Sequence, residues 1–162
     1  MLFWLVFGAI FGVWTVFQSS GLDFRLVAIG ALLPELVDAP FRAQSYAHTL
    51  LAAVAVLTVT MLATTGRGHR LRRRRALSLS IGWFAGLVLA ASWAHKEVFW
   101  WPAFGLDRPE APLLAAWPVV AIEELLGLAA AWWAWTRFGL GDPARRRAFL
   151  RTGRLVIVGE GV

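Results

Sequence analysis

Five apolar segments follow one another along this chain, and they restrict its fold more than any other feature. They cover residues 2–17, 24–37, 46–63, 77–94 and 113–135. A helix needs about 20 residues to cross the ~30 Å of hydrocarbon in a bilayer. The fifth segment is long enough, and the first, third and fourth approach that length. Hydrophobic residues make up 59% of the chain and charged residues 16%, whereas about a quarter of the residues of a soluble domain are charged. We therefore expect an all-α integral membrane bundle with four to five transmembrane segments.

The second segment, residues 24–37, is too short for a simple crossing. About 14 helical residues rise only about 21 Å. The segment leads into the stretch "GALLPELVDAPFRAQSYAHTLL", in which Pro34 and Pro40 interrupt the backbone. Irregular backbone is tolerated at membrane depth only where it is buried in protein or lines a cavity. We predict that this segment is short or re-entrant, which leaves the side of the N-terminus open.

Two blocks of arginine predict the orientation. One lies in the loop 66–76 and the other in the tail 137–162. Positive charge beside a membrane favours the cytoplasm, so both blocks are expected inside. The residues 96–112 and 38–48 then lie outside. The prediction is a transmembrane bundle at residues 1–136 with a basic cytoplasmic C-terminal tail, in a multi-pass protein of the cell (inner) membrane.

The same features predict partners. The arginine-rich loop and tail are expected to rest on anionic lipid head groups, at about 1 kcal/mol per residue. No nucleic acid is expected, because binding it would need a folded basic surface. Gly8 and Gly12 form a small-xxx-small pair, which suits contact with another helix, a partner membrane subunit or a second copy. The absence of cysteine excludes disulfides and thiolate metal ligands.

Ionisable side chains gather at the outer ends of the apolar segments. Glu35 and Asp38 end the second segment, His48 begins the third, and His95 and Glu97 follow the fourth. Residues three apart share one face of a helix, and two carboxylates on one face repel unless a cation or a proton lies between them. Carboxylates with imidazole suit zinc, manganese or iron. The alternative is that these side chains only contact water and head groups.

His48 is expected in the first turn of the third helix, with Ser45 as the N-cap. The positive end of a helix disfavours imidazolium, so the ring should be neutral and able to bind metal.

Glu123 and Glu124 lie within the fifth segment, about 15 Å below its start at Leu113. Ionisable groups at this depth indicate function by default. We expect at least one of them to face the interior of the bundle, either as a catalytic group or as a buried acid that holds helices together.

Three stretches share a pattern with known membrane proteins: "GALLPELVDAPF", "YAHTLL" and "WAHKEVFWWPAFG", between residues 27 and 105. Together they resemble the bacterial and archaeal membrane-bound metal-dependent hydrolase-like family, which includes LexA-regulated inner-membrane proteins. That family carries G-x-L-x-P-D-x-x-D, then a histidine before a helix, and later His-x-x-x-Asp ahead of a Trp-Pro segment. The resemblance implies a helical bundle with a divalent-metal site and a hydrolytic reaction, with a lipid or a phosphoester as the substrate class.

The resemblance transfers only in part. Glu35 takes the place of the motif's first aspartate, Asp38 matches the second, and His48 matches the histidine. If "WWP" is aligned on Trp-Pro, the His-x-x-x-Asp positions fall near Gly86 and Ala90, which cannot bind metal. The early histidine of the family has no counterpart among the first residues of this chain.

Two hypotheses follow. In the first, the chain is a membrane-embedded metal-dependent hydrolase with zinc, manganese or iron, whose metal ligands are Glu35, Asp38, His48 and His95. Its general base would be Glu97 or Glu124, acting on a water whose pKa the metal lowers. In the second, the chain is a catalytically inactive family member that serves as a structural or accessory subunit of a larger membrane complex.

Overall fold

The computed structural model describes residues 1–65 and 70–157. The described residues form seven α-helices: α1 Leu2–Phe17, α2 Phe24–Asp38, α3 Leu50–Ala63, α4 Arg70–Leu89, α5 Lys96–Phe99, α6 Trp117–Arg137 and α7 Pro143–Thr152. Three 3₁₀ turns and two short strands connect them: η1 Ala39–Phe41, β1 Ala43–Gln44, η2 Tyr46–His48, η3 Ser92–Ala94 and β2 Ala111–Pro112. The predicted all-α class is confirmed.

The helix boundaries differ from the predicted segments mainly where charge or a turn intervenes. The first segment matches α1 at both ends, and α2 extends one residue beyond the second. The third segment divides into η2 and α3. The fourth is displaced, because α4 already begins at Arg70 and ends at Leu89. Part of the arginine-rich stretch is therefore helix; its residues 66–69 lie outside the described residues.

Only α6, within the described ranges, is both long and apolar enough to cross a membrane. Just 11% of its most apolar window is buried in the protein, and large side chains such as Leu125 and Trp132 are exposed on it. The helices α1 and α3 are apolar but shorter. One possible membrane span is thus supported, while the bundle of four to five spans stays a prediction.

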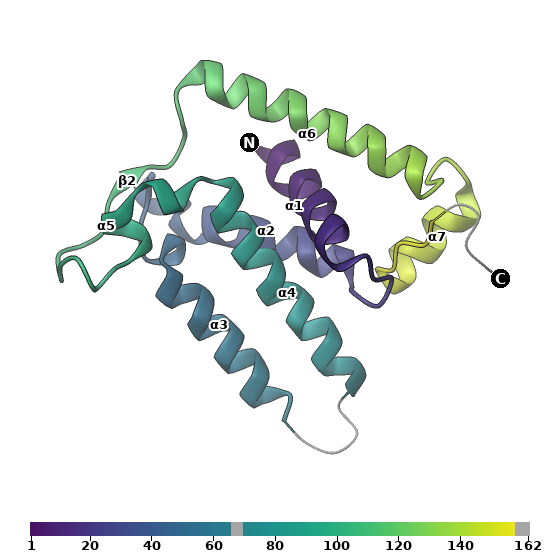
Figure 1. Ribbon diagram of the computed structural model, residues 1–162, viewed down its shortest axis with the longest axis horizontal. Coiled ribbons are helices and arrows are strands. Elements are labelled where there is room, and N and C mark those ends of the chain that lie inside the picture. Colours follow the sequence, from purple (N-terminus) through teal and green to yellow (C-terminus); the bar gives the residue numbers. More distant parts are fainter. Residues whose placement is uncertain (66–69, 158–162) are drawn as a thin grey trace.

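The helices pack around α1, α2 and α4. Helix α2 crosses α4, α1 contacts α2, α4 and α6, and α3 packs along α4. Figure 1 shows α3 and α4 descending side by side, with α6 running above α1. The two short strands pair antiparallel, Ala43 with Pro112 and Gln44 with Ala111. This pairing ties the chain after α2 to the chain before α6.

The crossing of α2 and α4 depends on glycine. A Cβ atom at Gly82 would collide with the carbonyl oxygen of Val27, and one at Gly86 would collide with that of Ala31. Small-xxx-small spacing lets two backbones approach closely. The position that the family resemblance reserves for a metal ligand near Gly86 is therefore occupied by a helix–helix contact.

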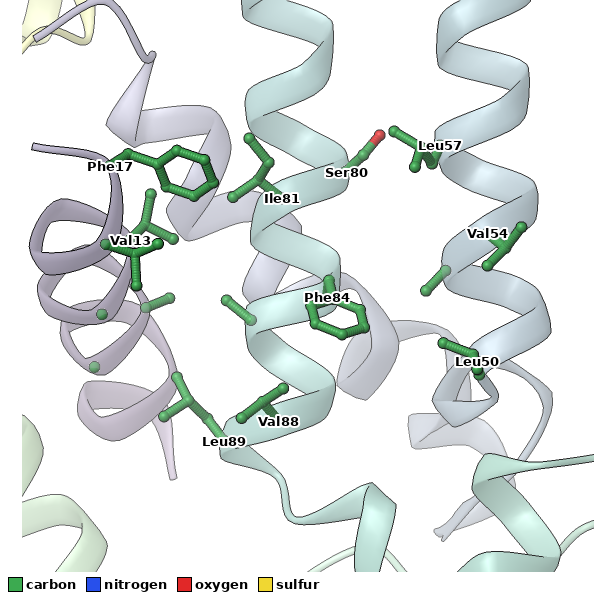
Figure 2. Close-up of a pocket in the computed structure, with 16 residues that line it drawn as sticks. Val13, Phe17, Leu50, Val54, Leu57, Ser80, Ile81, Phe84, Val88 and Leu89 are labelled. Carbon is green, nitrogen blue, oxygen red and sulfur yellow. The ribbon is translucent and has the colours of Figure 1, made fainter. Parts of the chain in front are cut away.

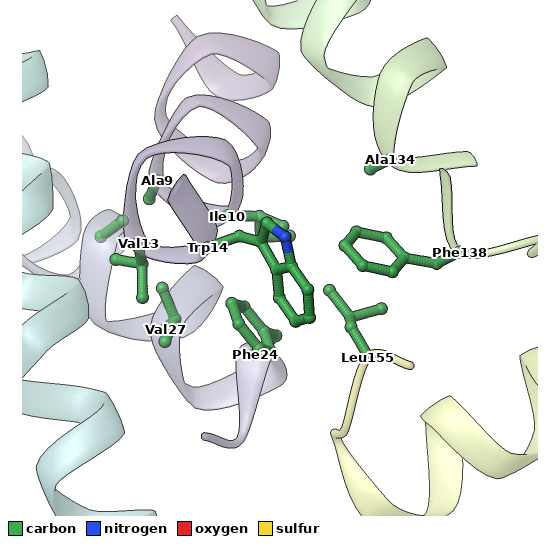
Figure 3. Packing of buried hydrophobic residues seen from close by; sticks show 10 residues of the cluster. Ala9, Ile10, Val13, Trp14, Phe24, Val27, Ala134, Phe138 and Leu155 are labelled. Atoms are coloured by element: carbon green, nitrogen blue, oxygen red, sulfur yellow. The ribbon is translucent and has the colours of Figure 1, made fainter. Parts of the chain in front are cut away.

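The largest core cluster joins both ends of the chain. Trp14 of α1 packs against Phe24 of α2, with ring centroids 5.7 Å apart, and against Phe138, at 4.8 Å. Leu155 is 2% exposed and belongs to the same cluster, as Figure 3 shows. The stretch predicted as a separate basic tail therefore contributes to the core of the bundle as far as residue 157.

An ion pair at the start of α2 holds this C-terminal stretch in place. Asp23 caps α2 and accepts hydrogen bonds from Arg25, whose Nη1 also donates to the carbonyl of Leu150 at 2.6 Å. The backbone N–H of Phe24 donates to the carbonyl of Gly153 at 2.8 Å. Burial alone raises the pKa of Asp23, but the hydrogen bonds and charge of Arg25 outweigh it and hold that pKa below its ordinary value.

Candidate functional site

The stretch after α2 folds back against that helix. Helix α2 ends at Asp38, and Pro40 lies in the turn η1 that follows. Pro34, which was also predicted to interrupt the backbone, lies inside the continuous helix α2, so that part of the prediction is wrong. The strand β1 and the turn η2 then return the chain, and η2 packs against α2. A residue ten positions after the end of the helix thereby reaches its last turn.

Asp38 and His48 form a buried pair in this fold. Asp38 is 1% exposed and His48 is fully buried. The Oδ2 atom of Asp38 lies 2.7 Å from Nδ1 of His48 and accepts the backbone N–H of Ser45, also at 2.7 Å. A carboxylate at Nδ1 holds the proton on that nitrogen and leaves Nε2 as the free ring nitrogen of the neutral tautomer. Asp38 therefore sets the orientation of the ring.

Glu35 lies on the other side of the same ring. Its Oε1 atom is 3.4 Å from Nε2 of His48, and both atoms are buried without a hydrogen-bond partner. The two carboxylates face opposite nitrogens, so Glu35, Asp38 and His48 cannot all bind one ion through a single atom each. The structure brings together three of the four predicted ligands, but as a row and not as a ring around one point.

The setting of His48 differs from the sequence-based expectation. His48 lies in η2, just before the N-cap of α3, and not in the first turn of that helix as predicted. Burial lowers its pKa, but the neighbouring carboxylates of Glu35 and Asp38 outweigh burial and raise that pKa above its ordinary value. Two acidic neighbours make this ring a site for positive charge, whether a proton or a cation.

The two glutamates of α6 have different surroundings. Glu124 pairs with the amino group of Met1 and accepts the backbone N–H of Phe3 at 3.1 Å. The Oε2 atom of Glu123 is buried without a hydrogen-bond partner, and Glu123 lies within electrostatic range of Glu35. The structure thus gives the predicted base Glu124 another partner.

His95 and Glu97 stand apart from these residues. Both side chains are exposed, next to the turn η3 and in α5. Across residues 1–65 and 70–157, neither side chain makes a hydrogen bond or ion pair with Glu35, Asp38 or His48. In the same part of the chain, no group of three or more His, Asp or Glu side chains has an arrangement that could hold a metal ion.

The pair of free atoms nevertheless fits a divalent metal. Two ligand atoms at about 2.0–2.1 Å from a tetrahedral zinc ion lie about 3.3–3.4 Å apart. The separation of Glu35 Oε1 and His48 Nε2, 3.4 Å, matches that edge. A carboxylate behind the other ring nitrogen is the usual support of a metal-binding histidine, which is the position of Asp38. The separation of these two atoms is therefore compatible with two ligands of a tetrahedral ion.

Helix α3 is capped by Thr49, so the predicted cap Ser45 is wrong. The Oγ1 atom of Thr49 accepts the N–H of Ala52 at 3.0 Å, whereas Oγ of Ser45 is buried without a partner. Thr49 directly precedes the apolar run, which is the ordinary sequence signal of an N-cap. That signal was available in the sequence.

Two further side chains of this region were missed. Nε1 of Trp83 donates to the carbonyl of Ala47 at 3.2 Å, and Nε2 of Gln44 donates to the carbonyl of Ala90 at 3.2 Å. Both bonds tie the turn before α3 to α4. No sequence signal indicates them, because each joins residues far apart along the chain.

Comparison with known proteins adds no relative: no protein family, curated protein or solved structure matches the chain. The resemblance noted from the motifs therefore remains a prediction.

Proposed function

We propose that this chain is a membrane-embedded metal-dependent hydrolase in which Glu35 and His48 bind a divalent zinc, manganese or iron ion. The observation that carries the proposal is the pair of buried atoms on these residues, 3.4 Å apart, which lie at ion-pair distance from each other and form no hydrogen bond. A buried polar atom without a partner costs about 1–3 kcal/mol. A single cation between the two atoms would satisfy both.

The residues around the pair then have separate roles. Asp38 holds the imidazole ring so that Nε2 faces Glu35. Glu123, with a free buried oxygen, is the preferred proton acceptor in place of Glu124, which is occupied by the amino terminus. The ion would supply Lewis acidity to the group being hydrolysed. A lipid or phosphoester substrate follows from the motif resemblance alone.

The proposed setting is a multi-pass protein of the cell (inner) membrane. The arginine-rich loop and the C-terminus would be cytoplasmic, and the Glu35–His48 site would lie near the outer face. The exposed apolar side chains of α6 and the positive charge of the loop support this arrangement.

Elemental analysis of the purified protein tests the metal. We expect one zinc, manganese or iron per chain in the wild type, and less than a tenth of that in Glu35→Gln and His48→Ala. Asp38→Asn should weaken metal affinity 10–100-fold, as loss of such a support usually does.

His95→Ala is the matched control, because His95 is exposed and forms no hydrogen bond or ion pair with Glu35 or His48. This variant should keep its metal. Circular dichroism in detergent identifies any variant that fails to fold, and Glu35→Gln preserves the volume of the side chain. Folded wild-type protein that takes up no metal, or equal metal in Glu35→Gln, would contradict the proposal.

An inactive accessory subunit is the second candidate. It is favoured by one observation, namely that the described residues contain no group of three or more metal-ligating side chains in a suitable arrangement. Wild-type protein without metal that co-purifies in constant ratio with another membrane protein would support this alternative.

A further inference from the structure

An apolar groove runs along α4, apart from the Glu35–His48 site. It has a volume of about 580 Å³ and lies between α1, α3 and α4, as Figure 2 shows. Its walls include Val13, Phe17, Leu50, Leu57, Phe84 and Val88. The hydroxyl of Ser80, the polar side chain in this lining, already donates to Oγ1 of Thr60 at 3.2 Å. The groove therefore offers no polar group to a ligand.

Gly12 of α1 leaves room in this groove. A Cβ atom at Gly12 would meet nothing within 4 Å, whereas one at Gly8 would touch the side chains of Leu89 and Trp4. Gly8 therefore packs against α4, as small residues on a helix often do. Gly12 borders an unfilled space on the surface.

Two arginines of α4 lie beyond one end of the groove, on the N-terminal side of the α4 residues that line it. Arg73 lies two helical turns before Ser80 on α4, and its Nη2 is 3.4 Å from Sδ of Met61, one turn beyond Leu57. Arg74 lies on the α1 side, where its Cζ would be 3.4 Å from a Cβ at Gly21. Within the described residues, neither guanidinium forms an ion pair with a carboxylate.

We propose that this groove binds one acyl chain of an anionic phospholipid, with the phosphate against Arg73 and Arg74. The walls match a hydrocarbon chain, and the unpaired guanidinium groups at one end match a phosphate, which arginine binds through two parallel hydrogen bonds. The end with the arginines is the predicted cytoplasmic end, where anionic lipids attract basic residues. An apolar helix of another protein in this groove would leave both arginines without an anionic partner. A phospholipid supplies a phosphate to them, so the charge at this end favours a lipid.

Native mass spectrometry of the full chain in detergent tests the site. The protein is titrated with phosphatidylglycerol and, separately, with phosphatidylcholine of the same acyl chains. We expect the wild type to retain one phosphatidylglycerol with at least fivefold higher affinity than phosphatidylcholine.

The apolar half of the site is tested by Gly12→Leu. The new side chain occupies the groove without a backbone collision, and leucine favours a helix more than glycine does, so the fold should persist. Retention of both lipids should fall at least fivefold. Ala129→Leu, on an exposed position of α6, is the matched control and should change neither.

The charged half is tested by Arg73→Gln combined with Arg74→Gln. This variant should lose the preference for phosphatidylglycerol while keeping the binding of phosphatidylcholine. Arg146→Gln with Arg147→Gln, on exposed positions of α7, removes the same charge elsewhere and should retain the preference.

Three results would overturn the proposal: equal retention of the two lipids by the wild type, unchanged retention in Gly12→Leu, or a lipid-free dimer that Gly12→Leu dissociates. The last would identify the groove as an interface between two copies. None of these measurements involves metal, so the outcome is independent of the proposed hydrolase.

Discussion

At the scale of single residues, one buried carboxylate decides the form of the candidate site. The Oδ2 atom of Asp38 accepts the N–H of Ser45 and faces Nδ1 of His48, and its Oδ1 atom accepts the N–H of Ala47 at 3.5 Å, so both oxygens are already used. Of the four predicted ligands, this leaves Glu35 and His48 with free atoms in contact range. The spacing of Glu35 and Asp38 along α2 puts both carboxylates on one face of the helix. Which nitrogen of His48 each carboxylate faces depends on how the chain returns through η2.

The two hydroxyl residues before α3 should respond differently to mutation. Thr49→Ala removes the N-cap of α3 and should lower the free energy of unfolding by about 1 kcal/mol. Ser45→Ala removes a buried hydroxyl that has no partner, so it should be neutral or stabilising. Thermal unfolding in detergent measures both. Equal destabilisation by the two variants would show that Ser45 has a partner in solution.

At the scale of elements, the crossing of α2 and α4 accounts for the absence of a counterpart to the later His-x-x-x-Asp motif. The positions that would carry the later motif are Gly86, which contacts Ala31 of α2, and Ala90, whose carbonyl accepts Gln44. Both are used for packing. A ligand at either position would separate the helices that support the Glu35–His48 pair.

Alanine at the crossing should therefore destabilise the protein. Gly82→Ala and Gly86→Ala each place a methyl group against a carbonyl of α2, and forced repacking costs about 1–3 kcal/mol. Gly12→Ala is the matched control, since its Cβ meets open space; it should be stabilising by up to about 1 kcal/mol. The readout is the midpoint of thermal unfolding. A midpoint for Gly86→Ala at or above that of the wild type would show that the two helices do not approach so closely.

At the scale of the whole molecule, the C-terminal stretch is part of the bundle. Phe138 and Leu155 are buried with Trp14, and Arg25 holds the carbonyl of Leu150. The sequence-based division into a bundle and a basic tail did not predict these contacts. The many arginines of α7 make this stretch look solvent-exposed, although a few apolar residues lie on either side of them. The proposed topology then requires this docked region to be on the cytoplasmic side.

Single-cysteine labelling tests that topology. The chain contains no cysteine, so Asp107→Cys and Arg146→Cys, both at exposed positions, are unambiguous reporters. In intact cells, a membrane-impermeant maleimide should label residue 107 and should label residue 146 only after permeabilisation. The opposite pattern would invert the topology, and labelling of both would show that the chain does not separate the two regions across a membrane.

The sequence by itself determined the helical class, the limits of α1 and α2, and the turn after Asp38. These depend on apolar run length and on proline, which act locally. The sequence also predicted that Glu35, Asp38 and His48 lie together. Only the tertiary structure decided which ring nitrogen each carboxylate faces, that His95 stays apart, and that Glu124 meets the amino terminus. Those outcomes depend on how the helices rotate and cross, and residue spacing along the chain does not specify contacts between distant segments.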